Sequence, residues 1–200
     1  TALVLALTTV VLTMIVVPSG VSAEVPTQVE IEAPLPGLYL APVGAMYAGV
    51  PFASISPAYS LISTDFAKLK SIISLLTPGL VVAVSGKAFS KAIAATVSDD
   101  IEVAVLEDAV NGRRSTALSS LWETKATTAV DAAHAKVGPD TIAKLLFTSG
   151  STGSPKGVIN TQRMLTSNQV MIETSYPSIG EGPPVLVDWL PWSHTFGANH

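Results

Sequence analysis

The sequence contains no cysteine, which excludes disulfide bonds, thiolate nucleophiles and cysteine-ligated metals. Charged residues are also scarce: they make up 13% of the 200 residues, against roughly 25% in an average soluble domain. The Lys and Arg residues are scattered, with Arg113 and Arg114 the only adjacent pair, and the formal net charge is −4. A nucleic-acid-binding protein normally carries a basic stripe that neutralises phosphates. We therefore expect no nucleic-acid partner.

The first 23 residues lack any charged side chain, since Glu24 is the first. Residues 1–17 are apolar apart from threonines, and Val21, Ser22 and Ala23 suit a small-residue cleavage site. The run is at the lower limit for a membrane span, which needs about 17–25 apolar residues, and it lacks the basic start of a signal peptide. A signal or membrane segment, a buried strand or helix, and the arbitrary start of a fragment all remain open. Membrane association is expected only through residues 1–23; the location is otherwise cytoplasmic, with a membrane-anchored or exported protein as the alternative.

Residues 24–37 contain three prolines and one short alternating stretch, 29–32, which indicates a linker with an edge strand. The pattern becomes regular from Leu38 onward. We therefore divide the chain into an apolar leader and proline-rich linker over 1–37 and a partial domain over 38–200.

Helical and strand patterns alternate within the second part. An apolar helix is predicted over 40–50, and an amphipathic helix follows that Ser63, Thr64 or Asp65 can cap and Pro78-Gly79 ends. Its apolar face consists of Phe66, Leu69, Ile72, Ile73 and Leu76. A buried strand over 80–84, a helix over 87–96 and a strand over 101–106 come next, and then a polar surface segment over 111–139 with one helix. This alternation predicts an α/β fold with a mostly parallel sheet and helical crossovers.

A Gly- and Ser-rich loop lies between two short apolar runs, 144–147 and 158–159, and Thr161 can cap a helix over about 162–174. Its three glycines, Gly150, Gly153 and Gly157, let backbone N–H groups approach a ligand closely. Successive N–H groups suit phosphate oxygens. The loop adds four hydroxyl groups and the positive charge of Lys156. Such a loop is suited to binding a polyphosphate.

Two other interpretations of this loop fit less well. A flexible linker predicts polar surroundings, yet apolar strands flank the loop closely. A Walker-type loop needs Gly-Lys-Ser/Thr after the first glycine and four residues. Here Gly150 is followed by Ser-Thr-Gly-Ser-Pro-Lys-Gly, which departs from that pattern at two positions.

The stretch LLFTSGSTGSPKGV, residues 145–158, resembles the phosphate-loop signature of the acyl-adenylating (AMP-forming, AMP-binding) superfamily of synthetases and ligases. Two further stretches agree in order: AMYAGVP at 45–51 followed by Ser56-Pro57, and LPWSHTFG at 190–197. Together with GVINT, VDWLPW and HTFGANH, they are similar to feruloyl-CoA synthase-like acid–CoA ligases. The resemblance covers about 38–200 and implies part of the large N-terminal domain of such an enzyme.

The resemblance implies an acid–thiol ligase, an acyl-CoA synthetase, acting on a small-molecule carboxylic acid, ATP and CoA. ATP, arriving with Mg²⁺, and a carboxylate such as ferulate give an acyl-adenylate, from which the CoA thiol displaces AMP. Lys156 and His194 are the implied catalytic residues, with His194 near the acyl pocket; a half-buried histidine between Trp192 and Phe196 is the competing account. The implied ATP-binding residues are Thr148, Ser149, Gly150, Ser151, Thr152, Gly153 and Lys156. No dedicated metal ligands are expected.

The sequence departs from the family pattern at Gln162, where many relatives carry His. The family's later motifs, which bind adenine and ribose and supply a catalytic lysine, would lie beyond residue 200. A catalytically incompetent remnant, or a membrane-anchored or exported protein that binds a phosphate ligand, therefore remains an alternative to a ligase. We also expect the isolated chain to be poorly soluble, because later strands complete the sheet in this fold.

Overall fold

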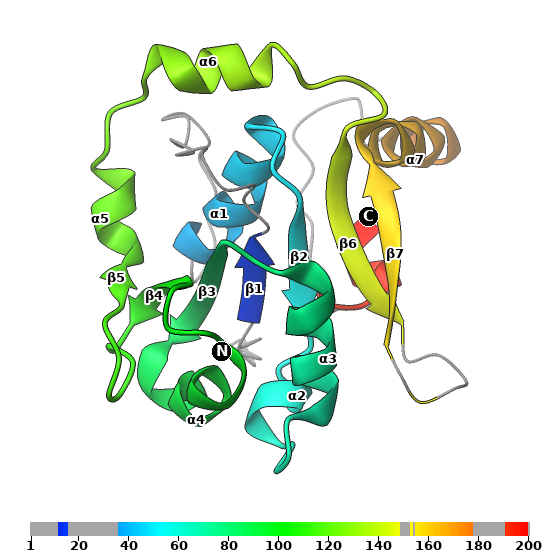
Figure 1. Cartoon of the computed structure of the whole chain (residues 1–200). Helices are drawn as coiled ribbons and strands as arrows, with labels where there is room; N and C mark the ends of the chain where they lie inside the picture. The colour runs from blue at the N-terminus through cyan, green and yellow to red at the C-terminus, as the bar shows by residue number, and fades with distance from the viewer. Residues whose placement is uncertain (1–11, 16–35, 149–152, 154, 178–190, 200) are drawn as a thin grey trace, which may run out of the picture.

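The structure is a computed structural model that describes residues 12–15, 36–148, 153, 155–177 and 191–199. Within these residues, seven strands form one sheet with the order β5-β4-β3-β1-β2-β6-β7 (Figure 1). The strands are β1 (Leu12–Ile15), β2 (Phe52–Ile55), β3 (Leu80–Ser85), β4 (Glu102–Glu107), β5 (Thr116–Ala117), β6 (Ile142–Thr148) and β7 (Lys156–Thr161).

The sheet is mostly parallel, as predicted. β2 pairs with β6, β3 with β4 and β4 with β5 in parallel, while β1 is antiparallel to both β2 and β3. β2 to β6 therefore run in one direction, and β7 opposes them beside β6. The predicted α/β fold class is confirmed.

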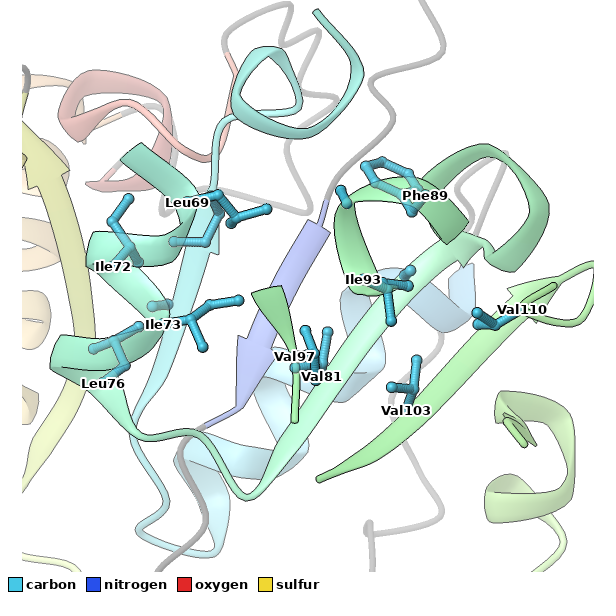
Figure 2. Packing of buried hydrophobic residues seen from close by; sticks show 14 of the residues in the cluster. Leu69, Ile72, Ile73, Leu76, Val81, Phe89, Ile93, Val97, Val103 and Val110 are labelled. Carbon is cyan, nitrogen blue, oxygen red and sulfur yellow. The ribbon is translucent and has the colours of Figure 1, made fainter. Parts of the chain in front are cut away.

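Helices cover both faces of the sheet. The helices are α1 (Pro36–Tyr47), α2 (Ala58–Leu61), α3 (Ala67–Leu76), α4 (Gly86–Thr96), α5 (Leu118–Trp122), α6 (Thr128–His134), α7 (Gln162–Ser175) and α8 (Thr195–Asn199). Successive strand residues point to opposite faces, so Val81 packs with α3 and α4 in one core cluster (Figure 2), while Val82 packs with α1 and α5 in another.

The amphipathic helix predicted from Phe66 onward is α3. Four of its predicted apolar residues, Leu69, Ile72, Ile73 and Leu76, are buried, and Phe66 packs against the same cluster. The predicted capping side chains act just before the helix. Ser63 Oγ accepts a hydrogen bond from Phe66 N at 3.0 Å, and Asp65 Oδ1 accepts one from Ala67 N at 3.1 Å. Ser63 Oγ also donates to Asp65 Oδ1 at 3.1 Å. The two donors on the carboxylate, Ala67 N and Ser63 Oγ, stabilise its charged form and lower the pKa of Asp65.

The junction between β3 and α4 is tightly packed because Gly86 begins the helix against the end of β4. Its N–H donates to Asp108 O at 3.0 Å. A Cβ atom added at Gly86 would lie only 2.4 Å from that carbonyl oxygen. Ser85 precedes it and caps α4, with Oγ accepting from Ala88 N at 3.2 Å. The sequence placed this helix start one residue later, at Lys87.

One prediction about the segment 111–139 is wrong. The sequence indicated one helix there, whereas the structure has two short ones, α5 and α6, together with β5. Each has seven residues or fewer, and helices of this length carry too few turns for a clear periodic signal.

The uncharged leader contributes one strand to the described structure. β1 lies between β3 and β2. Of the alternatives left open for the leader, a strand is therefore the one that applies to residues 12–15. The predicted edge strand at 29–32 and the rest of the leader lie outside the described residues. Among the helices that are described, none has the length and apolar character needed to span a membrane.

Candidate functional site

The predicted phosphate loop connects two paired strands. β6 and β7 form an antiparallel hairpin in which Thr148 lies opposite Lys156, and the register continues inward through Phe147 and Gly157. The strands thus bring Thr148, the first hydroxyl residue of the predicted loop, and Lys156 to the same end of the hairpin. This is the strand–loop–strand arrangement that the sequence predicted.

Three of the predicted ATP-binding residues belong to the described structure. Thr148 ends β6, and Lys156 begins β7 with an exposed side chain. Gly153 has φ of +83°, and no atom of the described residues lies within 4 Å of an added Cβ. Residues with a side chain rarely adopt this backbone conformation. Glycine is therefore favoured at position 153 by the backbone angle and not by steric crowding. The other predicted residues, Ser149, Gly150, Ser151 and Thr152, lie outside the described residues.

The helix after the hairpin begins as predicted. Thr161 caps α7, with Oγ1 accepting from Met164 N at 3.4 Å. Gln162 Nε2 donates to Met46 O at 3.3 Å and so connects the start of α7 to α1. The departure from the family pattern at this position thus has a structural use.

A cavity of about 290 Å³ lies at the carboxyl ends of β2 and β6. In open α/β sheets, ligands bind at this end of the strands. Its lining residues are Ser54, Ile55, Ser56, Tyr59, Ile72, Phe147, Thr148, Pro191, Ser193, His194 and Thr195. Thr148 belongs both to this cavity and to the predicted phosphate loop, which makes the two features neighbours.

The predicted acyl-pocket residue His194 lines this cavity and is exposed. Its backbone N–H donates to Pro191 O at 2.9 Å, and its Nδ1 accepts from Phe196 N at 3.3 Å. The ring nitrogen Nδ1 therefore serves the local turn. The competing prediction was a half-buried histidine between Trp192 and Phe196. In the structure His194 is exposed and lies beside the cavity.

The walls of the cavity are mixed in character. Tyr59, Ile72 and Phe147 supply apolar surface from three different elements, and Thr148 and His194 supply polar groups. Ser54 also lies at the cavity, and no signal in the sequence pointed to it. Its side chain is 2% exposed and its Oγ has no hydrogen-bond partner in the described structure.

Lys144 was also missed as a functional residue. It sits in the strand β6, is 5% exposed, and donates from Nζ to Ala198 O in α8. Burial lowers the pKa of the Lys144 ammonium to about 8. The one available signal was a lysine within an otherwise apolar strand.

A larger cavity, of about 470 Å³, lies beside β4 and β5 around Arg113. The guanidinium of Arg113 donates to Val97 O at 2.8 Å and to Ser98 O at 2.7 Å, and it also donates to Ile101 O. These carbonyls follow α4, so Arg113 stabilises the chain reversal there. In the described part of the chain, no cluster of His, Asp or Glu has the arrangement of a metal site.

Comparisons with known proteins identify the family of this chain. A family model described as AMP-binding enzyme matches residues 33–200. The crystal structure of ATP-bound MatB from Rhodopseudomonas palustris superimposes with a TM-score of 0.61 at 26% identity, over 82% of this chain and 29% of that one. The fatty acid AMP ligase from Legionella pneumophila gives a TM-score of 0.51 at 26% identity, over 83% of this chain and 26% of that one.

A curated relative is similar over a shorter stretch. The medium-chain-fatty-acid–[acyl-carrier-protein] ligase TtuA of Teredinibacter turnerae is 44% identical over 59 residues, which are 30% of this chain and 9% of that protein. The chain thus spans less than a third of the length of these relatives. Since the family model matches most of the chain and includes the β6–β7 hairpin and the cavity beside it, the chain belongs to the AMP-binding enzyme family.

Proposed function

We propose that this chain carries the phosphate loop and part of the acid-binding cavity of an acid-adenylating ligase. The observation that carries the proposal is the position of Thr148, which ends β6, begins the loop and lines the cavity. Adenylation joins two substrates, so a triphosphate site and a carboxylate site must meet. Thr148 lies where they would do so.

The reaction is nucleophilic displacement at the α-phosphorus. A carboxylate oxygen forms the new P–O bond while the bond to pyrophosphate breaks, and negative charge accumulates on the leaving group. Preorganised donors stabilise such charge. Lys156 and the groups of Thr148, Ser149, Gly150, Ser151, Thr152 and Gly153 would bind the phosphate oxygens, with Mg²⁺ entering as the ATP complex.

The cavity favours an acid with a compact apolar group. Its 290 Å³ is at the lower end of ligand sites, which range over about 300–1,000 Å³. Tyr59 and Phe147 suit an aryl group such as that of a hydroxycinnamate, while the names of TtuA and the Legionella ligase favour a fatty acid. His194 would orient the carboxylate at the mouth of the cavity.

A thiol would accept the acyl group in a second step. The sulfur attacks the acyl carbon and AMP leaves. CoA is the acceptor that the feruloyl-CoA synthase-like sequence features favour, and the name of TtuA makes an acyl-carrier protein the second candidate.

Calorimetric titration of the purified chain with Mg·ATP tests the phosphate site. We expect saturable binding that Lys156→Ala weakens roughly tenfold, equivalent to the loss of one charge-assisted contact of about 1.4 kcal/mol. Lys125→Ala is the matched control, because it removes another exposed lysine from the segment between α5 and α6. No binding by a folded chain, or equal loss in both variants, would contradict the proposal.

A second titration tests the acid. Ferulate, octanoate and the polar succinate are added in the presence of a non-hydrolysable ATP analogue. We expect one of the first two to bind and succinate not to bind. Equal binding of all three would show that the cavity does not select the acid.

A further inference from the structure

Lys144 is a buried cation whose place in the sheet calls for an explanation. It lies beside Phe52 of β2 and opposite Asn160 of β7, and it is 5% exposed. Among the described residues, no carboxylate forms an ion pair with it. Burying an unpaired charge is costly, and an apolar residue at this strand position would avoid that cost. A role other than packing is therefore indicated.

The partner of Lys144 is the carboxyl end of α8. The last carbonyl groups of a helix have no partner within it, and a helix of five residues is too short to be stable alone. Lys144 Nζ donates to Ala198 O, and Asn168 Nδ2, from α7, donates to Asn199 O. Two side chains from different elements thus hold the last two carbonyls of α8.

The other end of α8 bears His194. His194 O accepts from Ala198 N at 3.0 Å, so the residue that binds Lys144 is also joined by the helix to His194. At a rise of about 1.5 Å per residue, this one-turn helix is short enough that a displaced carboxyl end moves its start. His194 lines the cavity at that start.

We propose that Lys144 and Asn168 are positioning residues that hold α8 so that His194 faces the acid-binding cavity. The proposal rests on the proposed function for what His194 does there, but the position of His194 can be measured without a ligand. A lysine suits this task because its long side chain reaches from β6 to α8 and its charged donor makes a stronger hydrogen bond than a neutral one.

The test uses two near-isosteric variants of the full chain. Lys144→Met keeps the length and removes the donor, and Asn168→Asp keeps the shape and replaces the donor with an acceptor. The chain has three histidines, so the Cε1–H NMR signal of His194 can be assigned with His194→Ala. His134 serves as the internal control. It is the last residue of α6 and stacks on Tyr47, with ring centroids 3.8 Å apart.

We expect the His194 signal to move in both variants and the His134 signal to stay. Octanoate or ferulate affinity should fall roughly tenfold, since small displacements in a site have effects of this size or larger, while Mg·ATP affinity should change less than about twofold. An unmoved His194 signal in either folded variant, or equal movement of both histidine signals, would overturn the proposal. If Lys144→Met does not fold, Asn168→Asp decides.

The failure of this proposal can be told apart from failure of the proposed function. If the wild-type chain binds none of the acids, the function fails, and the histidine signals still decide whether Lys144 and Asn168 position α8. If acids bind and the His194 signal does not respond to the variants, only the positioning role fails.

Discussion

The helices α3, of 10 residues, and α7, of 14 residues, differ in how many of their residues are buried. α3 places Leu69, Ile72, Ile73 and Leu76 in the core, whereas α7, with 14 residues, buries none. The strands beside them differ less, because β6 buries Ala143 and Leu146 while most of β7 is exposed. We call α3 and α4 with strands β3 and β4 the α3–α4 layer, and we call the hairpin with the helix after it the β6–β7–α7 unit.

The two regions also differ in how much apolar surface they leave exposed. The α3–α4 layer has side chains packed against both faces of its strands. The β6–β7–α7 unit carries the predicted phosphate loop, yet Val158, Ile159, Met164, Val170 and Met171 are exposed on it. An apolar surface of this kind normally contacts another segment or partner. The expectation of poor solubility remains a prediction, and this unit is where we expect its cause to lie.

The largest expected effect is a core truncation in the α3–α4 layer compared with its counterpart in the other unit. Ile93→Ala in α4, at 1% exposure, should lower the free energy of unfolding by about 2–5 kcal/mol through lost burial and a cavity. Met171→Ala in α7, at 59% exposure, should change it by less than about 0.5 kcal/mol. Urea denaturation followed by circular dichroism measures both.

Similar losses of unfolding free energy in Ile93→Ala and Met171→Ala would contradict this prediction. Such a result would mean that the surface of α7 is covered in solution, for example by self-association. Sedimentation at several concentrations would then show oligomers that Met171→Glu disrupts.

Much of the α3–α4 layer could be predicted because its sequence signals are local. The apolar face of α3 repeats at helical spacing. In the other unit, the hydroxyl of Thr161 likewise marks the start of α7. The hairpin around the predicted loop was likewise found, since two apolar runs and a glycine-rich loop stand next to one another in the sequence.

The features that could not be predicted from the sequence arise from contacts between residues far apart in the chain. Nothing near Lys144 in the sequence indicates that it meets Ala198, because the two are 54 positions apart. The central position of β1 and the unpaired hydroxyl of Ser54 are also products of the assembled sheet. Local patterns report which side of an element is apolar, but not which element covers it.

The second prediction concerns Lys144, at the strand where the β6–β7–α7 unit joins the rest of the sheet. Burial lowers its pKa from 10.5 to about 8, so the unfolded chain binds this proton more tightly than the folded chain. Between these values stability must therefore rise with pH. We expect an increase of roughly 1–3 kcal/mol, the full shift at about 1.36 kcal/mol per pH unit being reduced by residual solvent screening.

Lys144→Met should remove this rise and leave the chain as stable as the wild type at pH 7, or more stable, because replacing a buried charge with an apolar side chain is often stabilising. Thermal unfolding between pH 7 and 10.5 measures the contribution, with Lys70→Met on the exposed side of α3 as the matched control. An identical pH profile for wild type and Lys144→Met would show that the ammonium is solvated.

The smallest expected effect concerns two ion pairs, one beside each unit. Arg163 Nε lies 3.2 Å from Asp140 Oδ1 at the start of α7, and Arg113 lies 3.9 Å from Asp99 beside α4. Asp140→Asn should cost only about 0.2–0.5 kcal/mol of global stability, since both side chains are mostly exposed.

The local effect of Asp140→Asn should be larger than this global cost, because α7 has no buried residue and its first turn depends on contacts such as Arg163 N to Pro139 O at 2.8 Å. Hydrogen exchange in the first turn of α7 should therefore accelerate at low salt. Asp99→Asn should leave exchange in α4 unchanged, because three carbonyls still hold Arg113 and the core still holds the helix. Equal acceleration in both helices would show that surface charge, and not burial, governs the local stability of the two units.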